Sequence, residues 1–143
     1  MGITLFTDKI SIVAETGPDI VNITPELTAS VKRSQILHGS FNAVAIGSTS
    51  SLTTIEFEPG VVNDLKKALT RFAPPDIEYE HEKAWHDGNG HSHVQAALIG
   101  PSIALPVRDG HLALGSWQQT VIINHDNRAR ERVMEITIIG ETG

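Results

Sequence analysis

Histidines gather in one stretch of this 143-residue chain, His81–His93, whose sequence is HEKAWHDGNGHSH. It holds four of the seven histidines: His81, His86, His91 and His93. Imidazole is a strong ligand for zinc and neighbouring transition metals, and it can act as a general acid or base near neutral pH. This stretch is therefore the first place to look for chemistry.

The spacing of these histidines is compatible with a metal site. His91 and His93 are two positions apart, so on an extended backbone both rings point to one side and could grip one ion. On a helix the rings would diverge. His81 could be folded back by a glycine-containing loop, giving three imidazoles around a divalent metal, zinc being favoured, with a position left for water. The alternative is exposed or hydrogen-bonded histidines that hold no metal, and the sequence does not decide between the two.

Two acidic features accompany the histidines. The segment Asp87–Gly90 is typical of a plain turn, since Asp, Asn and Gly dominate turns. In the functional alternative, its glycines let the backbone approach a ligand while Asp87 and Asn89 offer an acceptor and an amide. Glu56 lies among threonines and apolar residues. Buried there, it would need a partner and could serve as an acid, a base or a ligand, although an outward-facing glutamate is commoner.

Two other segments could recognise an anion. Gly47–Ser51 offers hydroxyls and backbone N–H groups that could cradle phosphate, but it lacks the Gly-Lys-Ser/Thr ending of a P-loop, so a solvated loop is favoured. Arg128, Arg130 and Arg132 alternate, and on an extended segment they would form an anion patch. Neighbouring Glu131 and the acidic balance of the chain favour a solvated, charged strand edge instead.

The elements that must position these residues are short strands and a few helices. A helix is expected from Thr24 to about Ser34, with Pro25 in its first turn and Leu27 and Val31 facing inward. His38-Gly39 is expected to be a turn. Other strands are expected over Ile3–Ala14 (one strand or a bent pair), Phe41–Ile46, Leu52–Phe57, Ile103–Val107, His111–Leu114, Trp117–Asn124 and Arg132–Ile139, and other helices over Val61–Phe72 and Val94–Ile99.

This order of elements, with hairpins clustered toward the C-terminus, predicts a single α+β domain over residues 1–143. We expect a mostly antiparallel sheet with helices packed on one face. With 11 basic and 17 acidic residues the formal net charge is −6, which argues against nucleic-acid or anionic-membrane partners. The absence of cysteine excludes disulfides and thiolate metal sites. Neither a membrane span nor a secretory signal is evident, so a cytosolic protein is expected.

Several blocks along almost the whole chain together resemble the YjbQ-like family, which is described as a secondary thiamine-phosphate synthase family. The blocks are Ser51–Glu56, Glu58–Gly60, Asp64-Leu65, Glu80-His81, Asp87–His93, Gly100–Ser102, Leu105-Pro106, Asp109-Gly110 and Leu114–Gln119. Each block alone is weak, but their order makes a specific signal.

The resemblance implies a compact α+β homotrimer with a polar pocket near a subunit boundary, and with His81 and His93 as its imidazoles. It also implies an enzyme that joins a pyrimidine diphosphate to a thiazole phosphate, giving thiamine phosphate and pyrophosphate, as a secondary activity. One departure matters, because many relatives carry a histidine where this chain has Gly47. His91 is the expected substitute.

That reaction would need a metal, N–H donors or cations to stabilise the departing pyrophosphate. The expected catalytic residues are His81, His93, Asp87 and Glu56. The expected substrate-binding residues are Ser51, Asn89, Ser102 and Gln118, and the expected metal ligands are His81, His91 and His93. The alternatives are a non-catalytic metal- or metabolite-binding trimer, whose histidines stabilise the assembly, and a trimeric scaffold without a ligand.

Overall fold

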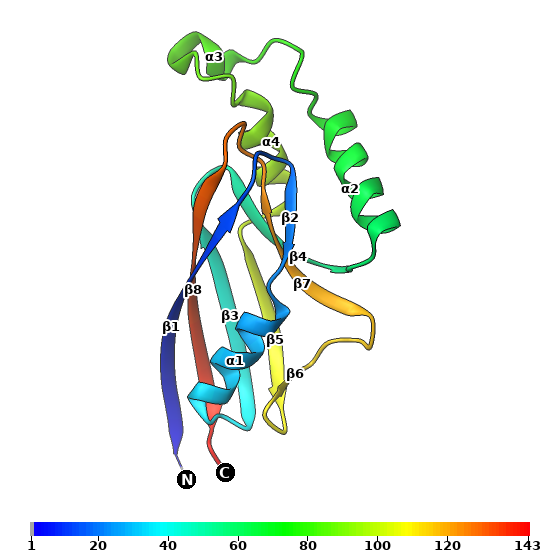
Figure 1. The fold of residues 1–143 in the computed structure, drawn as a ribbon. Coiled ribbons are helices and arrows are strands. Elements are labelled where there is room, and N and C mark those ends of the chain that lie inside the picture. Colours follow the sequence, from blue (N-terminus) through cyan, green and yellow to red (C-terminus); the bar gives the residue numbers. More distant parts are fainter. Residues whose placement is uncertain (1) are drawn as a thin grey trace.

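Two antiparallel sheets and four helices make up the fold of residues 2–143, which are the residues described by the computed structural model (Figure 1). The chain order is β1 (Ile3–Ala14), β2 (Asp19–Asn22), α1 (Thr24–Ser34), β3 (His38–Ile46), β4 (Ser50–Glu56), α2 (Pro59–Phe72), α3 (Glu80–Trp85), α4 (Gly90–Ile99), β5 (Ser102–Arg108), β6 (His111–Leu112), β7 (Gln118–Asn124) and β8 (Arg130–Glu141). The predicted α+β class is confirmed.

The strands form a five-stranded sheet of order β1-β8-β3-β5-β6 and a three-stranded sheet of order β2-β7-β4. Strands β1 and β8 pair along their whole length, from Ile3 opposite Glu141 to Ala14 opposite Arg130. Every strand pair within residues 2–143 is antiparallel, as predicted. The expectation of a single sheet is wrong, because β2, β4 and β7 pair only with one another.

Strand β7 divides the apolar interior into two cores. Ile122 points into the larger core, between the five-stranded sheet, α1 and β4. Its neighbours Val121 and Ile123 point the other way, into a smaller core that includes Leu69 of α2. This alternation is the two-residue period of a strand with both faces buried.

The two predicted amphipathic helices pack differently. Leu27 and Val31 of α1 are 0% and 2% exposed, so the predicted inward pair is confirmed. In α2 only Leu69 is fully buried, while Phe72 is 77% exposed. The rest of the fold therefore covers α2 only in part.

Two local predictions are wrong. His38 and Gly39 begin β3 instead of forming a turn, since Gly39 pairs with Gly140 of β8. A Cβ atom on Gly39 would lie 2.1 Å from the carbonyl oxygen of Ile139, so close strand approach explains this glycine. The helix expected from Val94 begins at Gly90, which places His91 and His93 on a helix. The short strand β2 and helix α3 were not predicted.

Within the described residues, no helix is both long and apolar enough to cross a membrane.

Candidate functional site

Helices α3 and α4 lie at one end of the molecule, where the β3–β4 loop and the β7–β8 turn also meet (Figure 1). Hydrogen bonds join these segments. The His125 N–H donates to the Thr49 carbonyl oxygen at 2.8 Å, and Ser92 Oγ donates to the His125 carbonyl oxygen at 2.6 Å. Segments far apart in the sequence therefore build this end together.

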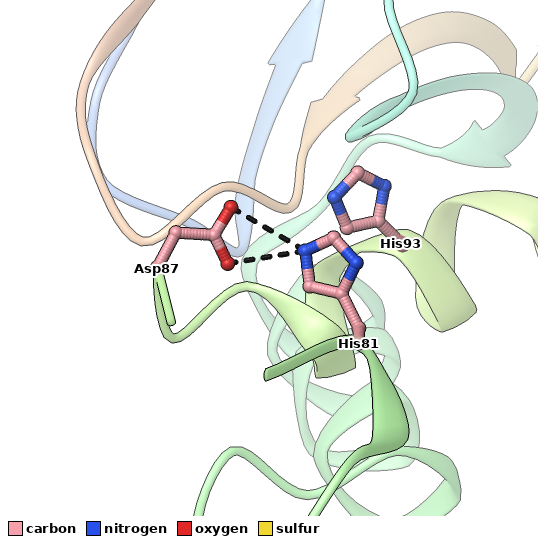
Figure 2. Close-up of side chains that lie close together, drawn as sticks. All are labelled: His81, Asp87 and His93. Atoms are coloured by element: carbon pink, nitrogen blue, oxygen red, sulfur yellow. Dashed lines mark hydrogen bonds and ion pairs between the residues drawn. The ribbon is translucent and has the colours of Figure 1, made fainter. Parts of the chain in front are cut away.

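Three of the predicted site residues converge here. His81 comes from α3, His93 from α4 and Asp87 from the link between them (Figure 2). Nε2 of His81 lies 3.1 Å from Oδ1 and 3.4 Å from Oδ2 of Asp87. The two imidazole centroids are 4.4 Å apart, and each residue offers a ligand atom within 4.8 Å of the others. We call His81, Asp87 and His93 the histidine–aspartate triad.

The link between α3 and α4 is shaped by its own residues. His86 ends α3 with a left-handed backbone, φ +52°, and Gly88 turns the chain again with φ +71°. Between them, Asp87 Oδ1 accepts a hydrogen bond from the Asn89 N–H at 3.0 Å. This turn places the Asp87 carboxylate beside the two imidazoles, and the functional interpretation of Asp87–Gly90 stays a prediction.

The electrostatics of the triad favour a carboxylate ligand. The Asn89 N–H holds the pKa of Asp87 below its usual value against partial desolvation, and His81 lowers that pKa further. Two imidazoles and one carboxylate are the donor set of many open zinc sites and of non-haem iron sites. Around zinc, ligand atoms lie about 3.3 Å from one another, so the triad would contract slightly to bind it.

A polar cleft of about 380 Å³ opens beside the triad. It is lined by Gly47, Ser48, Thr49, Asp87, Asn89, His93, Asp126, Arg130, Glu131 and Arg132. The β3–β4 loop therefore faces a cleft rather than bulk solvent alone. The lining combines Asp87 and His93 of the triad with Arg130 and Arg132 of β8.

Asp126 ties the walls of this cleft together. One of its carboxylate oxygens accepts from Thr49 Oγ1 at 2.9 Å, and the other from Asn89 Nδ2 at 3.2 Å. The Arg130 guanidinium lies 3.2 Å away. Burial raises the pKa of Asp126, but the Thr49 and Asn89 hydrogen bonds and the charge of Arg130 outweigh it, so the pKa is lowered. Asp126 is thus a buried anion held by the cleft walls.

Arg132 departs from the predicted solvated edge, because its side chain is only 8% exposed. Its Nη2 donates to the carbonyl oxygen and to Oγ1 of Thr49, at 3.0 and 2.6 Å. Nε donates to Asn124 Oδ1 at 3.0 Å. For Arg132 the solvated interpretation is wrong, since the cross-strand position of β8 turns this side chain inward. Arg128 and Arg130 are exposed, as expected, but β8 lies between β1 and β3, so the expected strand edge is wrong.

His125 is a buried, titratable residue near the site that the sequence analysis did not identify. It is 1% exposed, and its Nε2 and Nδ1 lie 2.8 Å from Ser51 Oγ and 2.9 Å from Gln95 Oε1. Burial, followed by the charge of Arg132, lowers its pKa to about 4. The available signal was the polar run Asn124–Asp126 directly after the apolar Val121–Ile123, which marks polar side chains at the end of a buried strand.

Of the remaining predicted residues, His91 and Ser51 lie nearby in other roles. The extended backbone assumed at His91 is wrong, and its ring is not in the triad; its Nε2 lies 3.3 Å from Ser92 Oγ. Ser51 is fully buried against His125. Asn89 lines the cleft, but its side chain is engaged by Asp126, Ser92 and Asn127. Asp87, rather than His91, is thus the third candidate metal ligand beside His81 and His93.

Three predicted residues lie away from the triad. Glu56 is exposed and stands six positions along β4 from Ser50, about 20 Å at the rise of a strand. Gln118 is opposite Glu56 and donates to Thr54 Oγ1. Ser102 is exposed at the start of β5, opposite Val44. Within one chain these residues do not join the histidines.

A larger cavity than this cleft does not coincide with the triad. It measures about 590 Å³ and lies against α3, with Glu78, Glu80, Glu82 and Lys83 among its lining residues. None of the triad lines it. The smaller cleft is the better candidate site, because convergent charged groups and ligand atoms identify a site more specifically than volume does.

Comparisons with known proteins agree with the fold and assign no activity. The family described as UPF0047 protein YjbQ-like matches residues 8–141. A UPF0047 protein of Methanothermobacter thermautotrophicus is 27% identical over 137 residues, covering 96% of this chain and 94% of the relative. One from Mycobacterium tuberculosis is 33% identical over 109 residues, covering 73% of this chain and 81% of the relative.

Solved structures extend the likeness to three dimensions. A YbjQ-like protein of unknown function from Sulfolobus solfataricus P2 superposes with a TM-score of 0.93 at 27% identity, covering 98% of this chain and 100% of that chain. An uncharacterised protein of the yjbq/upf0047 family from Clostridium acetobutylicum gives 0.84 at 26% identity, with coverages of 92% and 98%. The matching sequence pattern and fold, over nearly the whole chain, place this protein in the UPF0047 family of YjbQ-like proteins.

Proposed function

We propose that the protein is a metal-dependent enzyme of small phosphorylated metabolites, with its site at the histidine–aspartate triad. The observation that carries this proposal is the convergence of His81, Asp87 and His93, whose ligand atoms lie within 4.8 Å of one another at a polar cleft. Two imidazoles, one carboxylate and an open side are typical of catalytic zinc sites. The reaction that we propose is formation of thiamine phosphate and pyrophosphate from a pyrimidine diphosphate and a thiazole phosphate.

Such a reaction needs negative charge to be stabilised as pyrophosphate leaves. A divalent metal would supply Lewis acidity toward a phosphoryl oxygen. Among the protein's own groups, His81 and His93 would hold the metal while Asp87, oriented by the Asn89 N–H, completes the set. Arg130 and Arg132 line the same cleft and can offset phosphate charge. The cleft thus combines cation ligands and cationic side chains.

We further propose that the protein is a cytosolic homotrimer. The outer face of the five-stranded sheet supports self-association, because Leu5 and Ile139 stand opposite each other on it and are 66% and 43% exposed. The uncharged Thr7, Thr137 and Asn42 neighbour this pair on the same face, and Lys9 and Glu135 follow opposite each other. The exposed apolar pair on this open sheet face is suited to contact another protein surface.

Zinc titration of single-site variants tests the metal site. His93→Ala and Asp87→Asn should each weaken zinc binding by at least about 100-fold, because each removes a ligand of a three-ligand site. His86→Ala is the matched control, since it lies in the same stretch but outside the triad and should bind zinc like the wild type. Unchanged zinc affinity in His93→Ala would exclude this site.

A second candidate function is a non-catalytic metal-binding role. It is favoured by α3, which has no buried residue and would gain a tie to α4 through the triad. Turnover of the two phosphorylated substrates, assayed with the zinc-loaded protein, separates the candidates. An enzyme should form thiamine phosphate, and His93→Ala should not. A structural metal should raise the melting temperature without any product.

A further inference from the structure

Two hydrogen-bonding groups without partners converge beside Gly47, at the edge of the cleft. Ser50 is 2% exposed, and its Oγ has no hydrogen-bond partner in residues 2–143. A Cβ atom placed on Gly47 would lie 3.5 Å from Ser50 Oγ and 3.1 Å from Nη1 of Arg132. Both atoms therefore face the position that a side chain of residue 47 would occupy, and Ser50 Oγ is closed off from solvent behind Gly47, which lines the cleft.

Arg132 presents this Nη1 group on an otherwise immobilised side chain. Its Nε and Nη2 are held by Asn124 and Thr49. Within residues 2–143, Nη1 of Arg132 donates no hydrogen bond. Unpartnered side-chain atoms that are closed off from solvent are Glu26 Oε2, Ser50 Oγ and Thr120 Oγ1, and Nη1 does not belong to them. It is therefore accessible, and Arg132 lines the cleft. Burial lowers the pKa of Arg132, but a guanidinium remains protonated at neutral pH.

Two guanidinium groups of β8 line the cleft beside a buried carboxylate. Arg130 and Arg132 share one buried carboxylate, Asp126, at 3.2 and 3.9 Å. With Glu131, which also lines the cleft and opposes anion binding, these charges balance, so an anion would be recognised by hydrogen-bond donors rather than by excess positive charge. The carboxylate of Asp87 favours a cation at the triad.

We propose that Nη1 of Arg132 and Oγ of Ser50 form a phosphoryl-binding subsite beside Gly47, distinct from the metal ligands. A phosphoryl group accepts hydrogen bonds on several oxygens at once, which suits two donors that approach one space from different elements. A buried hydroxyl such as that of Ser50 costs free energy when it has no partner, so a bound oxyanion would supply the acceptor that the fold leaves unmet there. The proposal rests on the proposed function in taking the ligand to be phosphorylated.

Isothermal titration of metal-free protein tests the subsite apart from the metal site. Inorganic phosphate, pyrophosphate and a phosphomonoester are titrated separately to tell which source of the phosphoryl group binds, with acetate as a carboxylate control. Binding of at least one phosphorylated probe, tighter than that of acetate, is expected. Equal binding of acetate, or no binding of any phosphorylated probe, would overturn the proposal.

Two variants then test the two donors. Arg132→Lys keeps the charge but cannot both bind Asn124 and Thr49 and present a free donor, so phosphoryl binding should weaken by about 10- to 100-fold. Arg128→Lys is its matched control, since Arg128 does not line the cleft and should bind as the wild type does. Unaltered binding in Arg132→Lys would overturn the role of Nη1.

Ser50→Ala covers the case in which Arg132→Lys does not fold. This change breaks no hydrogen bond of the described chain, so stability should stay the same or rise while phosphoryl binding weakens several-fold. Thr120→Val removes another buried hydroxyl that lacks a partner, away from the cleft, and should leave binding intact. Loss of binding in both variants, or in neither, would count against the subsite.

The outcomes also separate this inference from the proposed metal site. If His93→Ala loses zinc but keeps phosphate binding that depends on Ser50 and Arg132, both proposals stand. If zinc binds at the triad while phosphate binding ignores Ser50 and Arg132, only the subsite fails. If phosphate binding depends on both donors while zinc ignores His93, only the metal site fails.

Discussion

At His125, neighbouring groups determine the tautomer as well as the charge. Gln95 Nε2 donates to the carbonyl oxygens of Leu69 and Ala73, so its Oε1 is free to accept from Nδ1–H of His125. With the proton on Nδ1, Nε2 accepts from the Ser51 hydroxyl. His125 is therefore a neutral link between β4 and α4. Ser51 is expected from the sequence to bind substrate, but its buried hydroxyl donates to His125 and does not reach the cleft surface.

This burial predicts a pH dependence of stability. The folded pKa of His125 is about 4, below the ordinary 6.5, so the unfolded chain binds more protons between these values. The free energy of unfolding should therefore fall as the pH drops from about 6.5 toward 4, by up to roughly 3 kcal/mol. His91, whose pKa burial also lowers, acts in the same direction. Urea unfolding at several pH values measures this slope.

The non-titrating variant His125→Asn provides the control for that experiment. It should be less stable than the wild type at pH 7.5, yet its stability should depend less on pH between 6.5 and 5. The carboxylates with lowered pKa, such as Asp87 and Asp126, lose their contributions in a lower pH range and do not mimic this effect. Parallel slopes in both proteins would show that His125 does not carry the dependence.

At the scale of elements, α2 depends on its ends more than on its buried face. Glu58, before its first residue, accepts hydrogen bonds from the Gly60 and Val61 N–H groups at 2.8 and 2.6 Å. Leu69 is its only fully buried residue. The sequence marks both ends of this helix, by Pro59 and by Pro74, but not how little of it the rest of the fold covers.

Removal of this cap should destabilise α2. Glu58→Ala is expected to cost about 1 kcal/mol, because two N–H groups of the first turn lose their acceptor. Glu58→Gln keeps an acceptor oxygen and should lose less. Amide hydrogen exchange within residues 59–72 measures the effect locally. Equal protection of these amides in Glu58→Ala and the wild type would contradict a capping role.

For the whole molecule, the exposed face of the five-stranded sheet predicts how subunits would meet. Leu5→Glu combined with Ile139→Glu should dissociate the proposed trimer, because two carboxylates would be buried on adjacent strands. Sedimentation equilibrium should show three times the monomer mass for the wild type and the monomer mass for the variant. Phe72→Glu, a change at an exposed apolar residue of α2, is the control. A monomeric wild type would refute the trimer.

The amino-acid sequence by itself determined what depends on neighbours along the chain. The two-residue period predicted most strands, including the full extent of β1. The helical period identified Leu27 and Val31 as the inward pair of α1. Residue type placed the candidate chemistry in His81–His93, because few other side chains can ligate a metal. The α+β class followed from the order of these elements.

Only the tertiary structure decided which of these side chains meet. His91 and His93 share one helix, so its phase selected His93 and turned His91 away. Arg130 and Arg132 lie on one face of β8, but only Arg132 is buried, where Asn124 and Thr49 accept its hydrogen bonds. His125 and Ser51 meet across 74 residues of chain. Such contacts depend on strand register and helix packing, which are set by long-range burial rather than by local sequence.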